Sequence, residues 1–162
     1  MNVKKSFLIE LERETNNTGR ILDRITDDHL DWRPHEKSMS VRELSTHIVD
    51  LHSWISKAIP KDVFDLKTDF QPLKIDSVSE LKAILTKGLV DNKETIAQLP
   101  DDDWLKEWVL KAGDWEIARL PKGGAIRHII TNHIIHHRGQ LTVYLRLLNI
   151  PVPGLYGPSA DE

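Results

Sequence analysis

Three histidines lie close together near the end of the chain, in the segment Asn132-His133-Ile134-Ile135-His136-His137-Arg138-Gly139-Gln140-Leu141. In a helix, at about 100° per residue, His133 and His137 fall on one face because they are four positions apart. Two imidazoles at this spacing can bind the same metal ion. His136 lies about 60° off the pair, so we expect it to support a ligand or to face solvent.

The helix that carries these histidines is expected to run from about residue 124 to residue 149. His133 and His137 stand in the middle of its apolar face, where a buried polar group without a partner costs about 1–3 kcal/mol. A metal ion would satisfy both imidazoles. The alternatives are core histidines bonded to backbone carbonyls, buried water or carboxylates. The apolar residues that share this face are Ile126, Ile129, Ile130, Leu141, Tyr144 and Leu148.

A third ligand is expected on the helix predicted for residues 40–59. His47 and His52 flank the apolar stripe of that helix at opposite shoulders, and the periodicity does not choose between them. Asp50 follows His47 by one turn; we expect a solvated carboxylate, with a role as hydrogen-bond acceptor or general base as the alternative.

The composition excludes several classes of protein. With 162 residues, 22 Lys and Arg, 25 Asp and Glu and a formal charge of −3, the chain fits a single domain over residues 1–162 and has no basic block for nucleic acid. The absence of cysteine excludes disulfides and thiolate ligands, so a transition metal must be bound by His, Asp or Glu. No signal peptide or membrane span is evident, and we expect a cytoplasmic protein.

Periodicity and capping signals predict four helices. The first covers residues 2–26, and the second begins with a capping box formed by Ser40 and Glu43 and is stopped by Pro60. After a long loop at residues 61–76, Ser77 and Glu80 form a second capping box, at the start of a helix that ends at Pro100. The fourth is the histidine-bearing helix.

Two segments are expected to be irregular. Residues 104–121 are predicted to form a short hairpin or an irregular crossover around Gly113. Residues 151–162 are predicted to form an irregular strap around Leu155 and Tyr156. Together these elements predict an all-α fold, a four-helix bundle with a long crossover before the last helix. Bundles of this kind place metal ligands on facing helices.

The sequence resembles the DinB family of bacterial metal-binding four-helix proteins along its whole length. The His-x-x-His-His-Arg-Gly-Gln block is the most specific part of the resemblance. The residues that carry it are Trp32-Arg33-Pro34, Ser38-Met39-Ser40, Leu44, His47-Ile48, Trp54, His133, His136-His137-Arg138-Gly139-Gln140-Leu141 and Leu145-Arg146. The resemblance implies that His47, His133 and His137 are the metal ligands, that His52 is not one, and that the protein forms a homodimer.

Family members include thiol-dependent transferases, metal-dependent hydrolases and proteins of unknown reaction, so the resemblance implies fold and metal site more than reaction. Three neutral imidazoles leave a position open for water or a small-molecule substrate such as a low-molecular-weight thiol. Zinc is favoured, with nickel, iron or manganese as alternatives. A non-catalytic metal-binding or stress-associated protein is the alternative function.

Two further residues are candidates for the site. Arg138 is expected to orient a ligand, to bind a substrate carboxylate or to form a surface ion pair, and Tyr156 is expected to reach the site from the tail.

Overall fold

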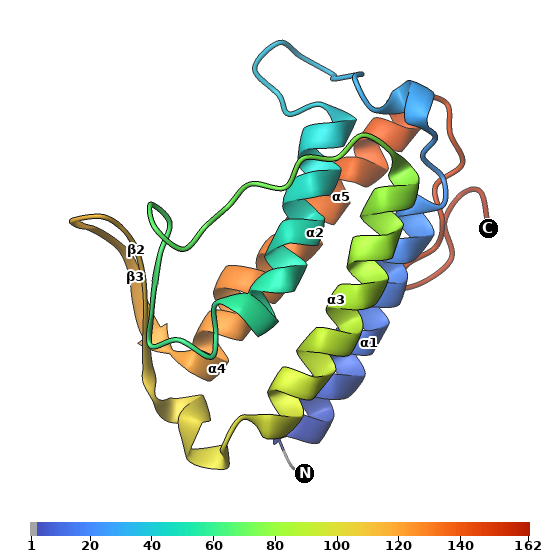
Figure 1. Cartoon of the computed structure of the whole chain (residues 1–162). Coiled ribbons are helices and arrows are strands. Elements are labelled where there is room, and N and C mark those ends of the chain that lie inside the picture. Colours follow the sequence, from blue (N-terminus) through green and yellow to red (C-terminus); the bar gives the residue numbers. More distant parts are fainter. Residues whose placement is uncertain (1–2) are drawn as a thin grey trace.

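Four long helices packed side by side form most of the computed structural model, which describes residues 3–162 (Figure 1). The α2 helix contacts α3 and α5, and α1 contacts the same two, so each long helix has two helical neighbours. Residue 2, where the first helix was expected to start, lies outside the described residues. The four helices are α1 (Val3–Leu22), α2 (Val41–Lys57), α3 (Val78–Gln98) and α5 (Asn132–Leu147).

Capping residues fix where α2 and α3 begin. The Ser40 hydroxyl accepts from the Glu43 amide at 3.1 Å, and the Glu43 carboxylate accepts from the Ser40 amide at 2.7 Å, so the first expected capping box is confirmed. At α3 the Ser77 hydroxyl accepts from the Glu80 amide at 3.2 Å. The Glu80 carboxylate instead accepts from the Asp76 amide at 3.0 Å, so this box is only half formed.

A three-stranded sheet corrects the expectation of an all-α chain. The predicted hairpin is present as β2 (Glu107–Ala112) and β3 (Trp115–Pro121), with Gly113 at φ 64° in the turn between them. A third strand, β1 (Val63–Asp65), pairs in parallel with β2 inside the segment that was expected to be a loop. Phe64 of this strand is buried, and its ring centroid lies 5.2 Å from that of Trp54 on α2. This packing holds β1 against α2.

The last helical segment is not one uniform helix as expected. The short helix α4 (Lys122–Gly124) leads into a π-helix, Ala125–Thr131, and α5 begins directly after it. In the π-helix the buried Thr131 hydroxyl donates to the Ile126 carbonyl, five residues back, at 3.0 Å. A π turn contains more residues than an α turn. The π-helix therefore shifts which side chains face the core in the segment just before the histidines of α5.

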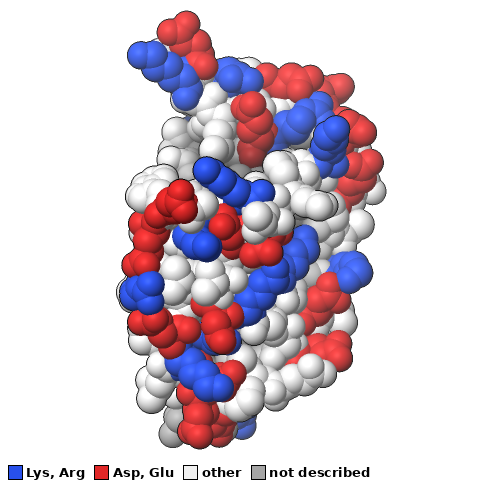
Figure 2. Space-filling view, turned by 60° about the vertical axis from the view of Figure 1, so that its left-hand side comes forward, with Lys and Arg blue, Asp and Glu red and all other residues white. Residues whose placement is uncertain are grey.

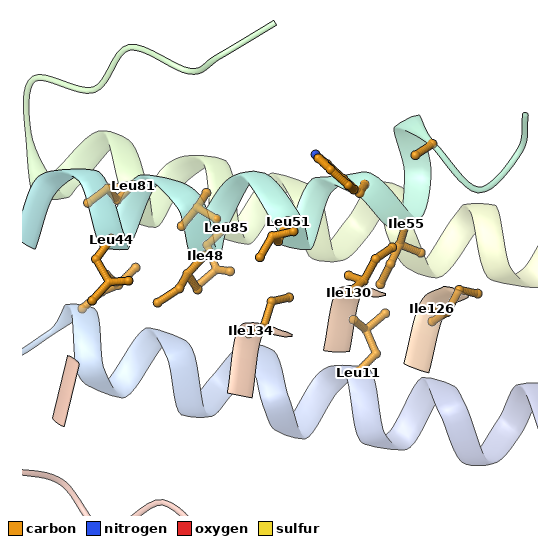
Figure 3. Close-up of a cluster of buried hydrophobic side chains, with 14 of the residues drawn as sticks. Leu11, Leu44, Ile48, Leu51, Ile55, Leu81, Leu85, Ile126, Ile130 and Ile134 are labelled. Carbon is orange, nitrogen blue, oxygen red and sulfur yellow. The ribbon is translucent and has the colours of Figure 1, made fainter. Parts of the chain in front are cut away.

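Buried aliphatic side chains hold the helices in register. Figure 3 shows them meeting between the helices, with the α2 side chains pointing at residues of α1 and of the last helical segment. The buried Trp108 indole donates to the Ala58 carbonyl at 3.1 Å and so fastens β2 to the end of α2. The labelled members of this cluster are Leu11, Leu44, Ile48, Leu51, Ile55, Leu81, Leu85, Ile126, Ile130 and Ile134.

The tail after α5 has no helix or strand, as expected, and is held by ion pairs. Arg146 pairs with Asp161 at 2.7 Å, and Glu162 pairs with Arg20 of α1 at 2.5 Å. Figure 2 shows acidic and basic side chains mixed over one face of the molecule. Within residues 3–162, none of the helices has the length and apolar character that crossing a membrane requires.

Candidate metal centre

The structure brings His47, His133 and His137 together between α2 and α5. The ring centroids of His133 and His137 are 4.5 Å apart, and that of His47 lies 5.0 Å and 4.8 Å from them. One possible ligand atom from each histidine lies within 4.8 Å of the other two. The geometry follows from the four-residue spacing on α5 and from the contact of α5 with α2.

All three rings are half-buried, and burial favours the neutral form of His47 and of His133. Burial, with smaller contributions from charge repulsion by His137 and His133, lowers the pKa of His47 to about 4. Burial also lowers the pKa of His133, with a second contribution from His137. Neutral imidazoles have a free lone pair at neutral pH, which is the form that binds a metal.

The two ring nitrogens of His137 have different surroundings. His137 Nδ1 lies 2.7 Å from Gln140 Oε1, whereas its Nε2 is buried and has no hydrogen-bond partner among the described residues. The Ile129 backbone, one turn earlier, raises the pKa of His133 and so opposes part of the lowering by burial. A buried nitrogen without a partner, beside two further imidazoles, fits a divalent transition metal because the ion would satisfy it.

His52 belongs to the core and not to the triad. Its Nε2 lies 2.8 Å from the Thr15 hydroxyl on α1, and its carbonyl accepts from the Asn92 amide on α3 at 2.7 Å. Gly88 of α3 passes so close that a β-carbon there would lie 2.9 Å from His52 Nδ1. Burial lowers the pKa of His52 to about 4. The ring is therefore satisfied by protein groups on the side of α2 that faces α1 and α3.

His136 and Gly139 lie on the exposed side of α5. The His136 ring centroid is 5.0 Å from that of His137, and its Nε2 lies 3.3 Å from the Gln140 amide nitrogen. A β-carbon placed on Gly139 would have no neighbour within 4 Å. His136 is therefore outside the three-histidine group.

Arg138 is buried and faces α1, which corrects the expectation of a surface ion pair. Its side chain is 1% exposed and pairs with the Glu14 carboxylate of α1. It also donates to the Glu14 carbonyl at 2.9 Å and to the Thr18 hydroxyl at 3.2 Å. The Tyr156 hydroxyl contacts Arg138 and donates to the Glu14 carboxylate at 2.7 Å, so the tail closes over this pair.

Glu14 was not predicted to have a role. Its spacing from Leu11, Thr15 and Thr18 on the buried face of α1 is the signal that could have marked it. A carboxylate on such a face needs a partner, and here the partner is Arg138.

Asp50 is also buried, which corrects the expectation of a solvated carboxylate. It is 6% exposed, and burial raises its pKa to about 6 against the opposing effects of Lys57 and the Ser53 hydroxyl. It is not part of the three-histidine group.

A separate cavity of about 990 Å³ lies between the start of α1 and the turn Asp101–Leu105. Phe7, Trp104 and Pro121 contribute to its wall, and none of the three histidines does. The cavity and the triad are therefore different places in the molecule.

Two proteins of Bacillus subtilis are similar to this chain in sequence. The uncharacterized protein YrdA of Bacillus subtilis is 25% identical over 162 residues, covering 96% of this chain and 89% of YrdA. The uncharacterized protein YjoA of the same organism is 26% identical over 131 residues, 81% of each chain.

Solved structures share the fold. A DinB-like protein from Bacillus cereus matches with a TM-score of 0.72 at 23% identity, covering 94% of this chain and 97% of the other. The DinB-like YjoA structure matches with a TM-score of 0.70 at 20% identity, covering 97% and 98%. The sequence profile of the DinB family matches residues 1–162. This mostly helical chain, with its three-histidine group, belongs to the DinB family.

Proposed function

We propose that the protein binds one divalent transition metal through His47, His133 and His137 and that it is a metal-dependent enzyme. The observation that carries the proposal is the buried His137 Nε2, which has no hydrogen-bond partner among the described residues and lies in the three-histidine group. When bound, the ion would supply a Lewis acid that activates water or a low-molecular-weight thiol.

The donor set supports this choice of metal. Imidazole nitrogens suit zinc, nickel and iron, and catalytic zinc sites commonly have three protein ligands and one open position. Zinc is favoured; nickel, iron and manganese are the alternatives. The chain itself contributes three imidazoles from two packed helices.

The reaction we propose is hydrolysis or transfer to a thiol, with a small-molecule substrate and a homodimeric protein. A non-catalytic metal-binding role is the second candidate. It is favoured by one observation, which is that the 990 Å³ cavity does not reach the triad.

Metal binding is tested on protein prepared without an affinity tag. We expect about one equivalent of metal by elemental analysis, and loss of high-affinity binding by calorimetry in His47→Ala, His133→Ala and His137→Ala. His128→Ala, at an exposed histidine, is the control and should bind as the parent does. Close to zero equivalents in the parent and in His133→Ala alike would end the proposal.

Catalysis is tested separately. The metal-loaded protein is screened against thiol and electrophile pairs and against esters and amides, beside a triple variant with alanine at the three histidines. Turnover that the triple variant lacks supports the enzyme, and its reaction class separates hydrolase from transferase. Equal rates for both proteins in every class would favour the non-catalytic role.

A further inference from the structure

Gln140 lies on the exposed side of α5, one turn after His136 and His137, and its amide contacts both rings. The amide oxygen is 2.7 Å from His137 Nδ1, and the amide nitrogen is 3.3 Å from His136 Nε2. One glutamine therefore joins a ring of the candidate centre to an exposed ring outside it.

The chemistry of an amide fixes the direction of these bonds. A carboxamide oxygen can only accept, so His137 Nδ1 carries the proton and donates to Gln140. The second ring nitrogen then has the lone pair, and this is the buried Nε2 in the three-histidine group. With the opposite tautomer, His137 would place an N–H into the centre and could not bind a metal there.

The contact with His136 is compatible with this orientation of the Gln140 amide. The amide nitrogen can only donate, and it lies against His136 Nε2, which accepts when its proton is on Nδ1. If the amide were reversed, its oxygen would face His136 and its nitrogen would face His137 Nδ1. The short 2.7 Å contact would then require His137 to accept at Nδ1 and to carry its proton on the buried Nε2.

We propose that Gln140 is a positioning residue that holds His137 as the Nδ1–H tautomer, so that Nε2 is its metal-binding atom. The part that concerns the metal rests on the proposed function. Hydrogen bonds of this kind to a metal-binding histidine typically change metal affinity about 10–100-fold when they are removed.

The test compares two substitutions of the same residue. Gln140→Leu removes the acceptor, whereas Gln140→Glu retains it. We expect zinc affinity, measured by competition with a chromophoric chelator, to fall about 10–100-fold in Gln140→Leu and to stay within a few-fold of the parent in Gln140→Glu. Gln98→Leu is the matched control, because Gln98 is also an exposed helix residue whose amide contacts a residue one turn away.

A second measurement does not depend on metal. In the metal-free protein, nitrogen-15 NMR of the imidazoles should show His137 as the Nδ1–H tautomer in the parent and in Gln140→Glu, and as a mixture in Gln140→Leu. Equal affinity in the parent and Gln140→Leu, equal loss in both Gln140 variants, or an unchanged tautomer in Gln140→Leu would each overturn the inference. A parent that binds no zinc would refute the proposed function, and the NMR result would still decide the role of Gln140.

Discussion

His47 and His52 are five residues apart on α2 and face different neighbours. Five residues turn a helix by roughly 140°, so one ring faces α5 while the other lies against α1 and α3. The Thr15 hydroxyl donates to the Leu11 carbonyl at 2.7 Å, so it accepts from His52 Nε2. His52 is thus a neutral core residue with satisfied hydrogen bonds.

The lowered pKa of His52 predicts a pH-dependent contribution to stability. Its pKa is about 4 in the folded protein, against about 6.5 for an unperturbed histidine. Between pH 6.5 and pH 4 the unfolded chain therefore takes up a proton that the folded chain does not, and stability falls as the pH falls. In metal-free His52→Gln this decline should be shallower by about 2–3 kcal/mol, as measured by urea unfolding at several pH values.

His128→Gln is the control for this experiment, because His128 is exposed. Its decline should follow that of the parent. If His52→Gln lost stability as steeply as the parent between pH 6.5 and pH 4, the account of His52 as a neutral core residue would be wrong.

At the residue scale, periodicity alone could place His133 and His137 on one face. It could not choose between His47 and His52, because both flank the same stripe, and the choice came from the resemblance. The burial of Asp50 and Arg138 could not be predicted either. The partner of Arg138 is Glu14, 124 residues away in the sequence, so its environment exists only once the chain has folded.

At the scale of elements, the capping boxes allow a direct comparison. Ser40→Ala removes a buried cap in a reciprocal pair and should lower the free energy of unfolding by about 1–2 kcal/mol. Ser77→Ala removes a one-way cap and should cost no more than about 1 kcal/mol. Chemical unfolding of both variants measures the two losses of stability and shows which is larger.

Restoring a cap provides the control. Ser40→Asp should recover most of the stability lost in Ser40→Ala, because aspartate also accepts from the backbone amide. A larger loss in Ser77→Ala than in Ser40→Ala would contradict the comparison.

The helices were predictable because their caps and apolar spacing are local signals. The β1 strand was not, since it has only three residues and pairs with a strand more than forty residues later. The π-helix was missed for a different reason. Ile126 and Ile130 also fit the spacing of an ordinary helix, and the bond of the Thr131 hydroxyl to a carbonyl five residues back leaves no distinct sequence pattern.

At the scale of the whole molecule, the Glu14 and Arg138 pair joins α1, α5 and the tail. Glu14→Gln would leave a buried guanidinium without a countercharge and should lower the free energy of unfolding by about 3 kcal/mol. Unfolding in urea, followed by tryptophan fluorescence, measures the loss.

Glu12→Gln is the matched control on the same helix. Glu12 pairs with Lys93 on the surface, and its loss should change stability by less than about 1 kcal/mol. Equal losses of free energy of unfolding in the two variants would mean that the buried ion pair stabilises the protein no more than the surface pair does.

The outward position of Gly139 makes the candidate centre accessible to spectroscopy. The chain has no cysteine, so Gly139→Cys would create a unique thiol in open space. The position is roughly 200° around α5 from His137, so the thiol would point away from the three rings. A nitroxide spin label attached there would report the distance between the label and a paramagnetic ion bound in the centre. The label itself would not compete with the histidines for that ion.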